Sequence, residues 1–529
     1  MLTSLLPLLG FGFCLSGSHA QSSTSQAPAP GATPTGNYAG ALRPQVHFSP
    51  PQGFMNDPNG MFVDANGTWH LYYQYNPTAL VAGNQHWGHA TSKDLYTWTN
   101  QPIALYPPNN TSGIFSGSAV IDTNNTSGFF NNSKTGVVAI YTLNTPTEQT
   151  QEIAYSYDGG YTFQPYARNP VLRIGSNQFR DPKVIWYQDH WVMVVAYSVD
   201  FTIGIYTSPN LKDWSFASNF TNHGLLGLQY ECPNLVQMPI KGTTDSAWVM
   251  YISINPGAPL GGSTGQYFVG NFNGTHFTTF DNAARLPDFG KDNYAGQWFY
   301  GTKAGEDPVS IAWASNWQYT NVVPTGSEGW RSIMSLPRRN YLDKATRIGW
   351  VLASEPYDLS PILGSTLLQS ANLFNNSATL DYSSVSSGAI YFRANITYPS
   401  TLAFSASTPA TLNFTFSSSA SGECMQGGYF FSSDNAGAVW VDRSTVKGFQ
   451  NPFFTDKFSL TQAGPPLATV IEGVIDRSVM EVFIDNGHFS STSVFYPKEK
   501  LDQMFIGTGG LAEGMKVEIG VWGLKGTWK

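Results

Sequence analysis

Short runs of β-branched and aromatic residues, separated by turn residues, recur along most of the chain. Between residue 45 and about residue 342 these runs include residues 69–74, 137–141 and 191–195. Runs of this length and composition are typical of β-strands. Helical patterns long enough to connect parallel strands are absent from the sequence, which disfavours an α/β barrel. The sequence therefore predicts an all-β protein.

A weak internal repeat indicates which all-β fold to expect. Segments 92–98, 156–163 and 208–214 each follow a strand-like run, contain turn residues and end on an aromatic residue. They recur about 50 to 65 residues apart, which leaves room for several short strands in each repeat. Repeats of this kind are typical of propeller blades. We expect a β-propeller over residues 41–345.

The C-terminal part of the chain has a pattern of its own. Residues 346–361 lose the strand pattern, which indicates a linker, and apolar and polar residues then alternate again at 390–394, 412–416 and 479–484. Because 529 residues exceed what one hydrophobic core usually supports, a second domain is expected. The alternation predicts a β-sandwich over residues 362–529.

The N-terminus has the features of a secretory signal. Residues 5–15 are an apolar run, and Ser18-His19-Ala20 resembles a small-residue cleavage site. The run is too short to span a bilayer comfortably, and no later stretch of the sequence is long and apolar enough. We expect a signal peptide at residues 1–20, a solvated Ser/Thr/Pro-rich arm at 21–40, and secretion to the extracellular or cell-wall space.

Sequons for N-glycosylation support secretion independently. Eleven Asn-x-Ser/Thr triplets without an intervening proline are spread over the whole chain, beginning at Asn66, Asn109, Asn110, Asn124, Asn125, Asn131, Asn219, Asn273, Asn375, Asn395 and Asn413. Their number favours a glycosylated surface.

Charge and cysteine usage restrict the partners. The net charge of −8, without a basic stripe, argues against nucleic acid and anionic membranes as partners. The 15 tryptophans and 27 tyrosines offer flat faces to sugar rings instead. Cys14 lies in the expected signal, and Cys232 and Cys424 fall in different expected domains. No Cys/His cluster has zinc spacing, so we expect neither a metal nor another cofactor.

Three short segments present an acidic residue in an unusual setting. These are Asn56-Asp57-Pro58-Asn59-Gly60, Arg180-Asp181-Pro182 and Glu231-Cys232-Pro233. Each alone has a structural interpretation, because Asp-Pro-Asn-Gly is a good turn sequence and adjacent Arg and Asp residues can form an ion pair.

Taken together, and in this order and spacing, the three segments resemble the signature blocks of glycoside hydrolase family 32. Further blocks agree: residues 87–90 (WGHA), 115–118 (FSGS), 252–259 (ISINPGAP), 311–317 (IAWASNW), and 476–478 (DRS) followed by 481–483 (EVF). The resemblance covers nearly everything from residue 45 onward and is strongest to yeast-type invertases. It implies a five-bladed β-propeller with the site at its axis, followed by a C-terminal β-sandwich.

The resemblance also implies roles for the three acids. Asp57 would be the nucleophile, Glu231 the general acid/base, and Asp181 the group that stabilises the transition state. Retaining hydrolysis needs two carboxyl groups about 5 to 5.5 Å apart. Because three acids in a small cavity repel one another's charge, we expect Glu231 to hold a proton and Asp57 to stay ionised. We further expect Arg180 to hold Asp181 ionised.

The family blocks imply a set of substrate-binding residues as well, namely Asn56, Gln74, Trp87, Phe115, Ser116, Arg180, Asn255 and Trp317. Asp292, in the segment 289–294 (FGKDNY), is a further candidate. Trp87 and Trp317 are expected to wall the pocket, and Asp292 to lie at its rim. In one departure from the family, Phe54 stands where invertases usually carry tryptophan, which removes an N–H donor beside the nucleophile block.

The expected activity is that of a retaining β-fructofuranosidase acting on sucrose and fructo-oligosaccharides, with some fructosyl transfer. Fructosyltransferase and exo-inulinase stay open as alternatives within the family. A catalytically inactive fructan-binding protein is the alternative from another class, and the presence of all three acids argues against it. A homodimer is one option for the assembly.

Overall fold

The computed structural model describes residues 27–130, 136–303, 305–345, 348–400, 409–431, 437–462 and 467–528. The expected signal peptide and the sequon at Asn131 lie outside these ranges. The described residues form 34 strands and the short 3₁₀ helices Ser198–Asp200, Thr320–Val322, Pro324–Glu328 and Ser360–Ile362, without an α-helix. No described helix is long and apolar enough to cross a membrane.

Five sheets follow one another between Gly53 and Pro356. The first contains β1 (Gly53–Val63), β2 (Trp69–Asn76), β3 (His86–Ser92), β4 (Trp98–Leu105) and the short β19 (Trp330–Arg331). The second contains β5 (Gly113–Ile121), β6 (Val137–Asn144), β7 (Gln149–Ser156) and β8 (Gln164–Pro165). The third contains β9 (Phe179–Tyr187), β10 (His190–Tyr197), β11 (Thr202–Ser208) and β12 (Ser215–Thr221).

The fourth sheet contains β13 (Tyr230–Pro239), β14 (Ser246–Ile254), β15 (Thr264–Phe272) and β16 (Phe277–Thr279). The fifth contains β17 (Tyr294–Trp298), β18 (Val309–Ala314), β20 (Ile333–Met334), β21 (Arg338–Ala345) and β22 (Gly349–Pro356). Strand β22 lies inside the segment expected to be a linker. It pairs with β21 along its whole length, so backbone hydrogen bonding continues where the side-chain pattern weakens.

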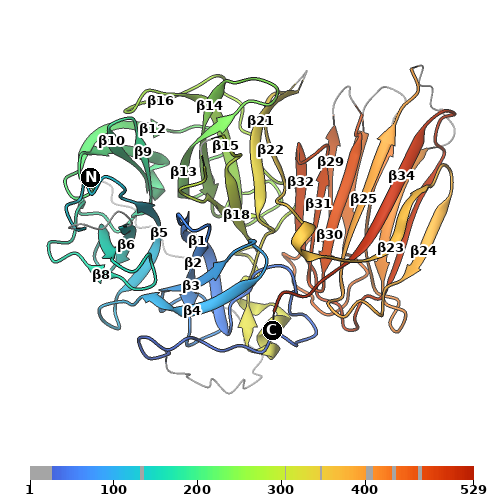
Figure 1. Ribbon diagram of the computed structural model, residues 1–529, viewed down its shortest axis with the longest axis horizontal. Helices are drawn as coiled ribbons and strands as arrows, with labels where there is room; N and C mark the ends of the chain where they lie inside the picture. Colours follow the sequence, from blue (N-terminus) through green and yellow to red (C-terminus); the bar gives the residue numbers. More distant parts are fainter. Residues whose placement is uncertain are drawn as a thin grey trace, which may run out of the picture.

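The first strands of the five sheets form a ring. Strands β1, β5, β9, β13 and β17 each contact the next, and β17 contacts β1. Strand β19 pairs in parallel with β1, which ties the end of this region to its start. Viewed in Figure 1, the sheets surround a common axis, from blue β1 to yellow β22. This arrangement is a β-propeller.

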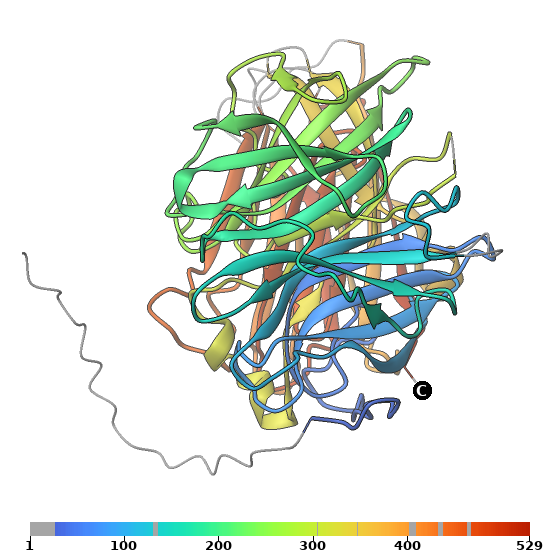
Figure 2. The ribbon, with the colours of Figure 1, turned by 90° about the vertical axis from the view of Figure 1, so that its left-hand side faces the viewer.

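Two further sheets pack face to face beside the propeller, as the orange and red strands of Figures 1 and 2 show. One contains β23 (Leu363–Asn372), β34 (Lys516–Leu524), β25 (Ala389–Thr397), β30 (Val470–Asp476), β31 (Val479–Ile484) and β32 (Phe489–Val494). The other contains β24 (Ser377–Asp381), β33 (Gln503–Gly509), β26 (Ala410–Ser417), β27 (Cys424–Phe431), β28 (Gly437–Asp442) and β29 (Lys457–Gln462). Alternate residues of both sheets fill one apolar core, which is typical of a β-sandwich.

Buried charged groups join the two parts of the molecule. Arg338 in β21 donates to Glu481 in β31 at 2.6 Å and also pairs with Asp288. The ring of His47 lies 2.9 Å from Asp476 and 3.3 Å from Glu481. Burial lowers the pKa of His47, but the two carboxylates outweigh it and raise the pKa to about 9. The sandwich is therefore fixed against the propeller by ionic contacts that water does not screen.

Candidate active site

Every inner strand of the propeller bends at a β-bulge near its amino end. The pairing register shifts between Met55 and Pro58 in β1, between Phe115 and Gly117 in β5, and correspondingly in β9, β13 and β17. Bulges re-aim side chains and are common beside active sites. Asp57, Ser116 and Asp181 lie within these bulges, and Glu231 lies at the start of one. The ring thus brings the three acids together from β1, β9 and β13.

Asp57 is buried and held from two neighbouring strands. The Ser116 hydroxyl donates to its Oδ2 at 2.6 Å, and the Cys232 thiol lies 3.4 Å from the same oxygen. Burial raises the pKa of Asp57, whereas hydrogen bonds from Ser116, Asn56 and Cys232 lower it. The hydroxyl of Ser116 thus favours the ionised carboxylate against the effect of burial.

Asp181 lies in a strained part of β9, with a left-handed φ of 66°. Its backbone N–H donates to the Thr142 hydroxyl at 3.1 Å, and the backbone N–H of Cys232 donates to its Oδ2 at 3.0 Å. Cys232 is itself left-handed, with φ 46°. Burial raises the pKa of Asp181 to about 7, although the charge of Arg180 lowers it. Backbone strain of this kind persists where the surrounding structure enforces it and concentrates at functional sites.

Glu231 is held at both carboxylate oxygens. Arg180 donates to Oε1 from Nε at 3.2 Å and from a terminal nitrogen at 3.0 Å, and the Tyr294 hydroxyl donates to Oε2. Burial, reinforced by the nearby Glu231 charge, raises the pKa of Tyr294 well above its ordinary value, so this hydroxyl stays protonated. The Glu231 side chain is 16% exposed, more open than Asp57 or Asp181 at 7% and 5%. Glu231 therefore faces the mouth of the site and the aspartates lie deeper.

The family models match almost the whole chain. The N-terminal domain model of glycosyl hydrolases family 32 matches residues 47–350, and the C-terminal model matches residues 365–522. The chain belongs to glycoside hydrolase family 32. The all-β architecture of a propeller followed by a sandwich, which the sequence predicted, is confirmed by its family 32 structural neighbours.

Relatives within family 32 are similar over most of their length. An extracellular exo-inulinase from Meyerozyma guilliermondii is 44% identical, over 86% of this chain and 90% of the relative. Invertase 2 from Saccharomyces cerevisiae is also 44% identical, over 86% and 89%. A fructofuranosidase from Schwanniomyces occidentalis, solved with fructose, superposes with a TM-score of 0.83 at 38% identity, over 92% of this chain and 99% of that one.

Two expectations for the family 32 site are wrong in detail. Arg180 was expected to hold Asp181 ionised and fixed; its charge does lower the pKa of Asp181, but its hydrogen bonds go to Glu231 and to the side chains of Gln149, Gln178 and Gln229. The bulge turns the Asp181 carboxylate towards Cys232 instead. Asp292 was expected at the pocket rim, but it is fully buried and accepts from Arg443 at 2.8 Å and from the Val494 backbone at 2.9 Å. Asp292 therefore joins the propeller to the sandwich.

The expected tryptophan walls differ from each other. Trp87 is fully buried, and its indole N–H donates to the Phe115 carbonyl at 3.1 Å, so it supports β5 from behind and offers no open face. Trp317 is partly exposed and packs on Trp313 at 4.8 Å between ring centroids. Trp317 therefore retains an accessible face and Trp87 does not.

The other expected binding residues lie around the inner strands. Gln74 is buried and donates to the Ile114 carbonyl at 2.9 Å. Asn56, Phe115 and Asn255 are partly exposed. The Asn255 backbone N–H donates to the backbone carbonyl of Gln229 at 3.4 Å, and the Gln229 side chain accepts from Arg180. Asn255 is thereby linked to the group that orients Glu231.

Tyr294 and Cys232 contact the three acids, and the sequence gave only indirect signals for both. Tyr294 stands two residues after Asp292 in segment 289–294, where Asp292 was the candidate, and Cys232 was expected only to pack beside Glu231. The Cys232 thiol instead lies between Asp57 and Asp181, at 3.4 and 3.7 Å from their Oδ2 atoms. Burial raises the pKa of Cys232 well above its ordinary value, so it is a neutral contact and no thiolate nucleophile.

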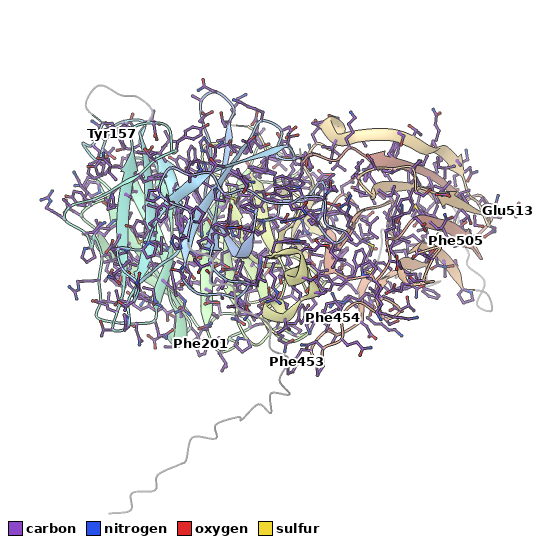
Figure 3. All side chains as sticks on the ribbon, turned by 90° about the horizontal axis from the view of Figure 1, so that it is seen from below. Tyr157, Phe201, Phe453, Phe454, Phe505 and Glu513 are labelled. Carbon is purple, nitrogen blue, oxygen red and sulfur yellow. The ribbon has the colours of Figure 1, made fainter. Side chains whose placement is uncertain are left out.

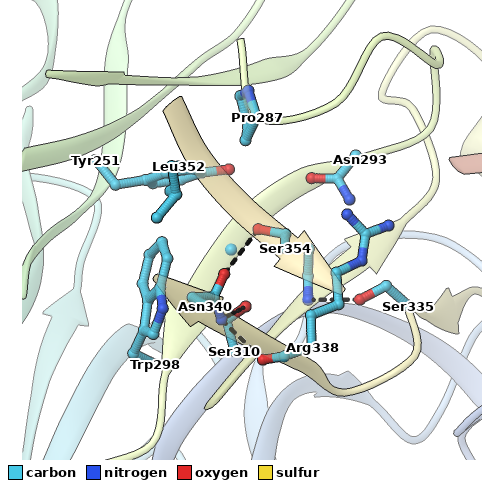
Figure 4. Close-up of a pocket in the computed structure, with 12 residues that line it drawn as sticks. Tyr251, Pro287, Asn293, Trp298, Ser310, Ser335, Arg338, Asn340, Leu352 and Ser354 are labelled. Atoms are coloured by element: carbon cyan, nitrogen blue, oxygen red, sulfur yellow. Dashed lines mark hydrogen bonds between the residues drawn. The ribbon is translucent and has the colours of Figure 1, made fainter. Parts of the chain in front are cut away.

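Two cavities lie away from the acids. The cavity in Figure 4, bordered by Tyr251, Trp298 and Asn340, measures about 20 Å³, which accommodates one water-sized molecule and no sugar. A cavity of about 1460 Å³ opens at the carboxyl ends of the inner strands, where Phe62 and Trp186 line it. The acids lie near the amino ends of the same strands, so neither cavity is the candidate active site.

Proposed function

We propose that this chain is a secreted, retaining β-fructofuranosidase that hydrolyses terminal β-D-fructofuranosides such as sucrose. The observation that carries the proposal is the convergence of Asp57, Asp181 and Glu231 on one end of the propeller axis, with the Cys232 thiol within 3.7 Å of both aspartates. Relatives named invertase, exo-inulinase and fructofuranosidase support the substrate class.

In the first step Asp57 attacks the anomeric carbon of the fructosyl group. Its buried carboxylate, oriented by Ser116, forms the new C–O bond as the glycosidic C–O bond breaks. Glu231 donates its proton to the departing glycosidic oxygen, and its exposed position suits a leaving group at the mouth. Arg180 and Tyr294 orient Glu231 for this transfer.

In the second step water resolves the fructosyl ester. Formation of the ester removes the negative charge of Asp57, so Glu231, now ionised, accepts a proton from the incoming water. The water oxygen bonds to the anomeric carbon and the Asp57 carboxylate leaves. Asp181 hydrogen-bonds the sugar hydroxyls throughout, and these bonds strengthen as positive charge develops on the ring.

Exo-inulinase activity is the second candidate, because a relative at 44% identity carries that name. Fructosyl transfer uses the same ester with a sugar hydroxyl in place of water. The proposed catalytic domain covers residues 41–345 and is extended by β22. The proposed assembly is a homodimer, which light scattering of the secreted protein tests.

Product analysis tests the proposal as a whole. Concentrated sucrose and, separately, inulin are incubated with the protein, and glucose, fructose and kestoses are quantified. We expect equal glucose and fructose from dilute sucrose, with added kestoses at high sucrose. No turnover of either substrate by folded protein would overturn the hydrolase proposal in favour of a fructan-binding protein.

A further inference from the structure

The sheet of β24, β33, β26, β27, β28 and β29 has an outer face that lies away from the propeller. Its inner face supplies Leu412, Phe414 and Phe416 to the sandwich core, so the alternate residues of β26 point outwards. The partner sheet faces the propeller, because its Tyr391 and Phe483 pack with residues of the propeller side. Phe505, which belongs to the outer face, lies at the end of the molecule remote from the propeller (Figure 3).

Asn413 stands in the middle of this outer face, between two glycines. Its cross-strand partners are Gly428 in β27 and Gly507 in β33. The space above each glycine is filled by a neighbouring side chain: a Cβ atom placed on Gly428 would lie 2.5 Å from Oδ1 of Asn413, and one placed on Gly507 would lie 2.6 Å from Cβ of Ser377. Asn413 is the first residue of the sequon Asn413-Phe414-Thr415, and Thr415 shares its face.

An aromatic ring leans over each of these glycines. A Cβ atom placed on Gly428 would lie 3.0 Å from Nε1 of Trp440, and one placed on Gly507 would lie 3.1 Å from Cζ of Phe505. The indole and the phenyl ring thus approach Asn413 from opposite sides. Trp440 is partly exposed and Phe505 is 39% exposed, so both rings keep open surface.

The chemistry of this face suits a neutral sugar. The outward neighbours of Asn413 along β26 are Thr411 and Thr415, and the Asn413 amide nitrogen donates to the Thr411 hydroxyl at 3.2 Å. Aromatic rings bury the apolar faces of sugars, and hydroxyl and amide groups satisfy sugar hydroxyls. A charged or fully apolar partner would find little complementarity there.

We propose that Asn413 is N-glycosylated and that the first sugars of its glycan lie on this sheet face between Trp440 and Phe505. The Asn413 amide nitrogen bonds to the anomeric carbon of a lipid-pyrophosphate-linked oligosaccharide, and the lipid pyrophosphate leaves as the amide nitrogen loses one proton. The second amide hydrogen remains, so the bond to Thr411 can persist. The proposal rests on the secretion included in the proposed function.

Site mapping tests the modification. The full chain is secreted from a yeast host and treated with a peptide-N-glycosidase in ¹⁸O-labelled water, and conversion of each sequon asparagine to labelled aspartate is measured by mass spectrometry. Asn273, exposed between β15 and β16, is the comparison site. We expect label at Asn413. Asn413 without a glycan overturns the proposal, whether or not Asn273 is modified. Sucrose hydrolysis is measured separately, so that a failure of the glycosylation proposal is distinguished from a failure of the proposed activity.

Release of the glycan from folded protein tests its position on the sheet. An endoglycosidase should act more slowly at Asn413 than at Asn273, and Trp440→Ala or Phe505→Ala should accelerate release at Asn413 by about tenfold, equivalent to about 1.4 kcal/mol. Phe453→Ala is the matched control, because Phe453 is 52% exposed in the same domain and lies well away from Phe505 (Figure 3). Unchanged release in both variants overturns the packing. A second outcome also overturns the packing: the glycosylated protein binds a free fructan, and Trp440→Ala abolishes that binding. The sheet face would then be open and not covered by the glycan.

Discussion

Replacement of Ser116 by alanine should move the acid limb of the pH–rate profile upwards. The Ser116 hydroxyl donates to Asp57 at 2.6 Å, and this bond lowers the pKa of a carboxyl group that burial raises. In the proposed mechanism Asp57 must be ionised to attack, so activity should fall as the pH drops through its pKa. Without the hydroxyl this loss begins at a higher pH.

The size of the effect follows from the kind of bond that is lost. A hydrogen bond to a charged group contributes about 1.5–3 kcal/mol, and 1.36 kcal/mol corresponds to about one pKa unit. We expect the acid limb of kcat/KM on sucrose to rise by about one to two pH units, with a smaller loss of activity at the optimum pH.

Initial rates of glucose release between pH 3 and pH 8 measure the shift. Ser118→Ala is the matched control, because Ser118 is buried in the same strand but donates to the Pro182 carbonyl at 2.9 Å. Its acid limb should stay in place. An unchanged acid limb in Ser116→Ala, with the protein folded, would refute the idea that Ser116 stabilises the ionised nucleophile.

Glu231→Gln should lower kcat on sucrose by several powers of ten in a folded protein, and activity above about a tenth of the original would remove Glu231 from the acid/base role. Asp57→Asn should abolish turnover, while the unaltered enzyme releases fructose with the β configuration retained; early α anomer in NMR spectra would contradict a nucleophilic Asp57. Phe54→Trp should reduce the ratio of kestose to fructose formed at high sucrose, because the ring of Phe54 packs against Trp317 at 6.2 Å between centroids. The same ratio in the variant and the unaltered enzyme, at matched sucrose concentration, would count against this. Arg338→Met should lower the free energy of unfolding by about 3–5 kcal/mol, because it removes the buried cation that the Asp288 and Glu481 carboxylates share; denaturant titration measures this, and a change below about 1 kcal/mol would contradict it.

The fold was predictable because it depends on patterns that are local in the sequence. Period-two alternation, turn residues and the lack of helical periodicity are properties of neighbouring residues, and they identify strands wherever they occur. Strand β22 was missed, and a linker was predicted in its place, because backbone pairing with β21 needs no strong side-chain signal. Asp57, Asp181 and Glu231 could be proposed from the sequence because each stands in a short motif beside a proline and the three motifs together resemble the family 32 blocks.

The sequence by itself determined the all-β class and the two-part architecture, and it proposed Asp57, Asp181 and Glu231 as the catalytic acids. Tertiary structure alone decided how those acids are paired. Arg180 stands next to Asp181 in the chain and yet binds Glu231 from another strand, and Asp292 was expected at the pocket rim and yet faces the sandwich. The physical reason is that a bulge reverses the direction of a side chain within one residue, and the ring then decides which strands are neighbours.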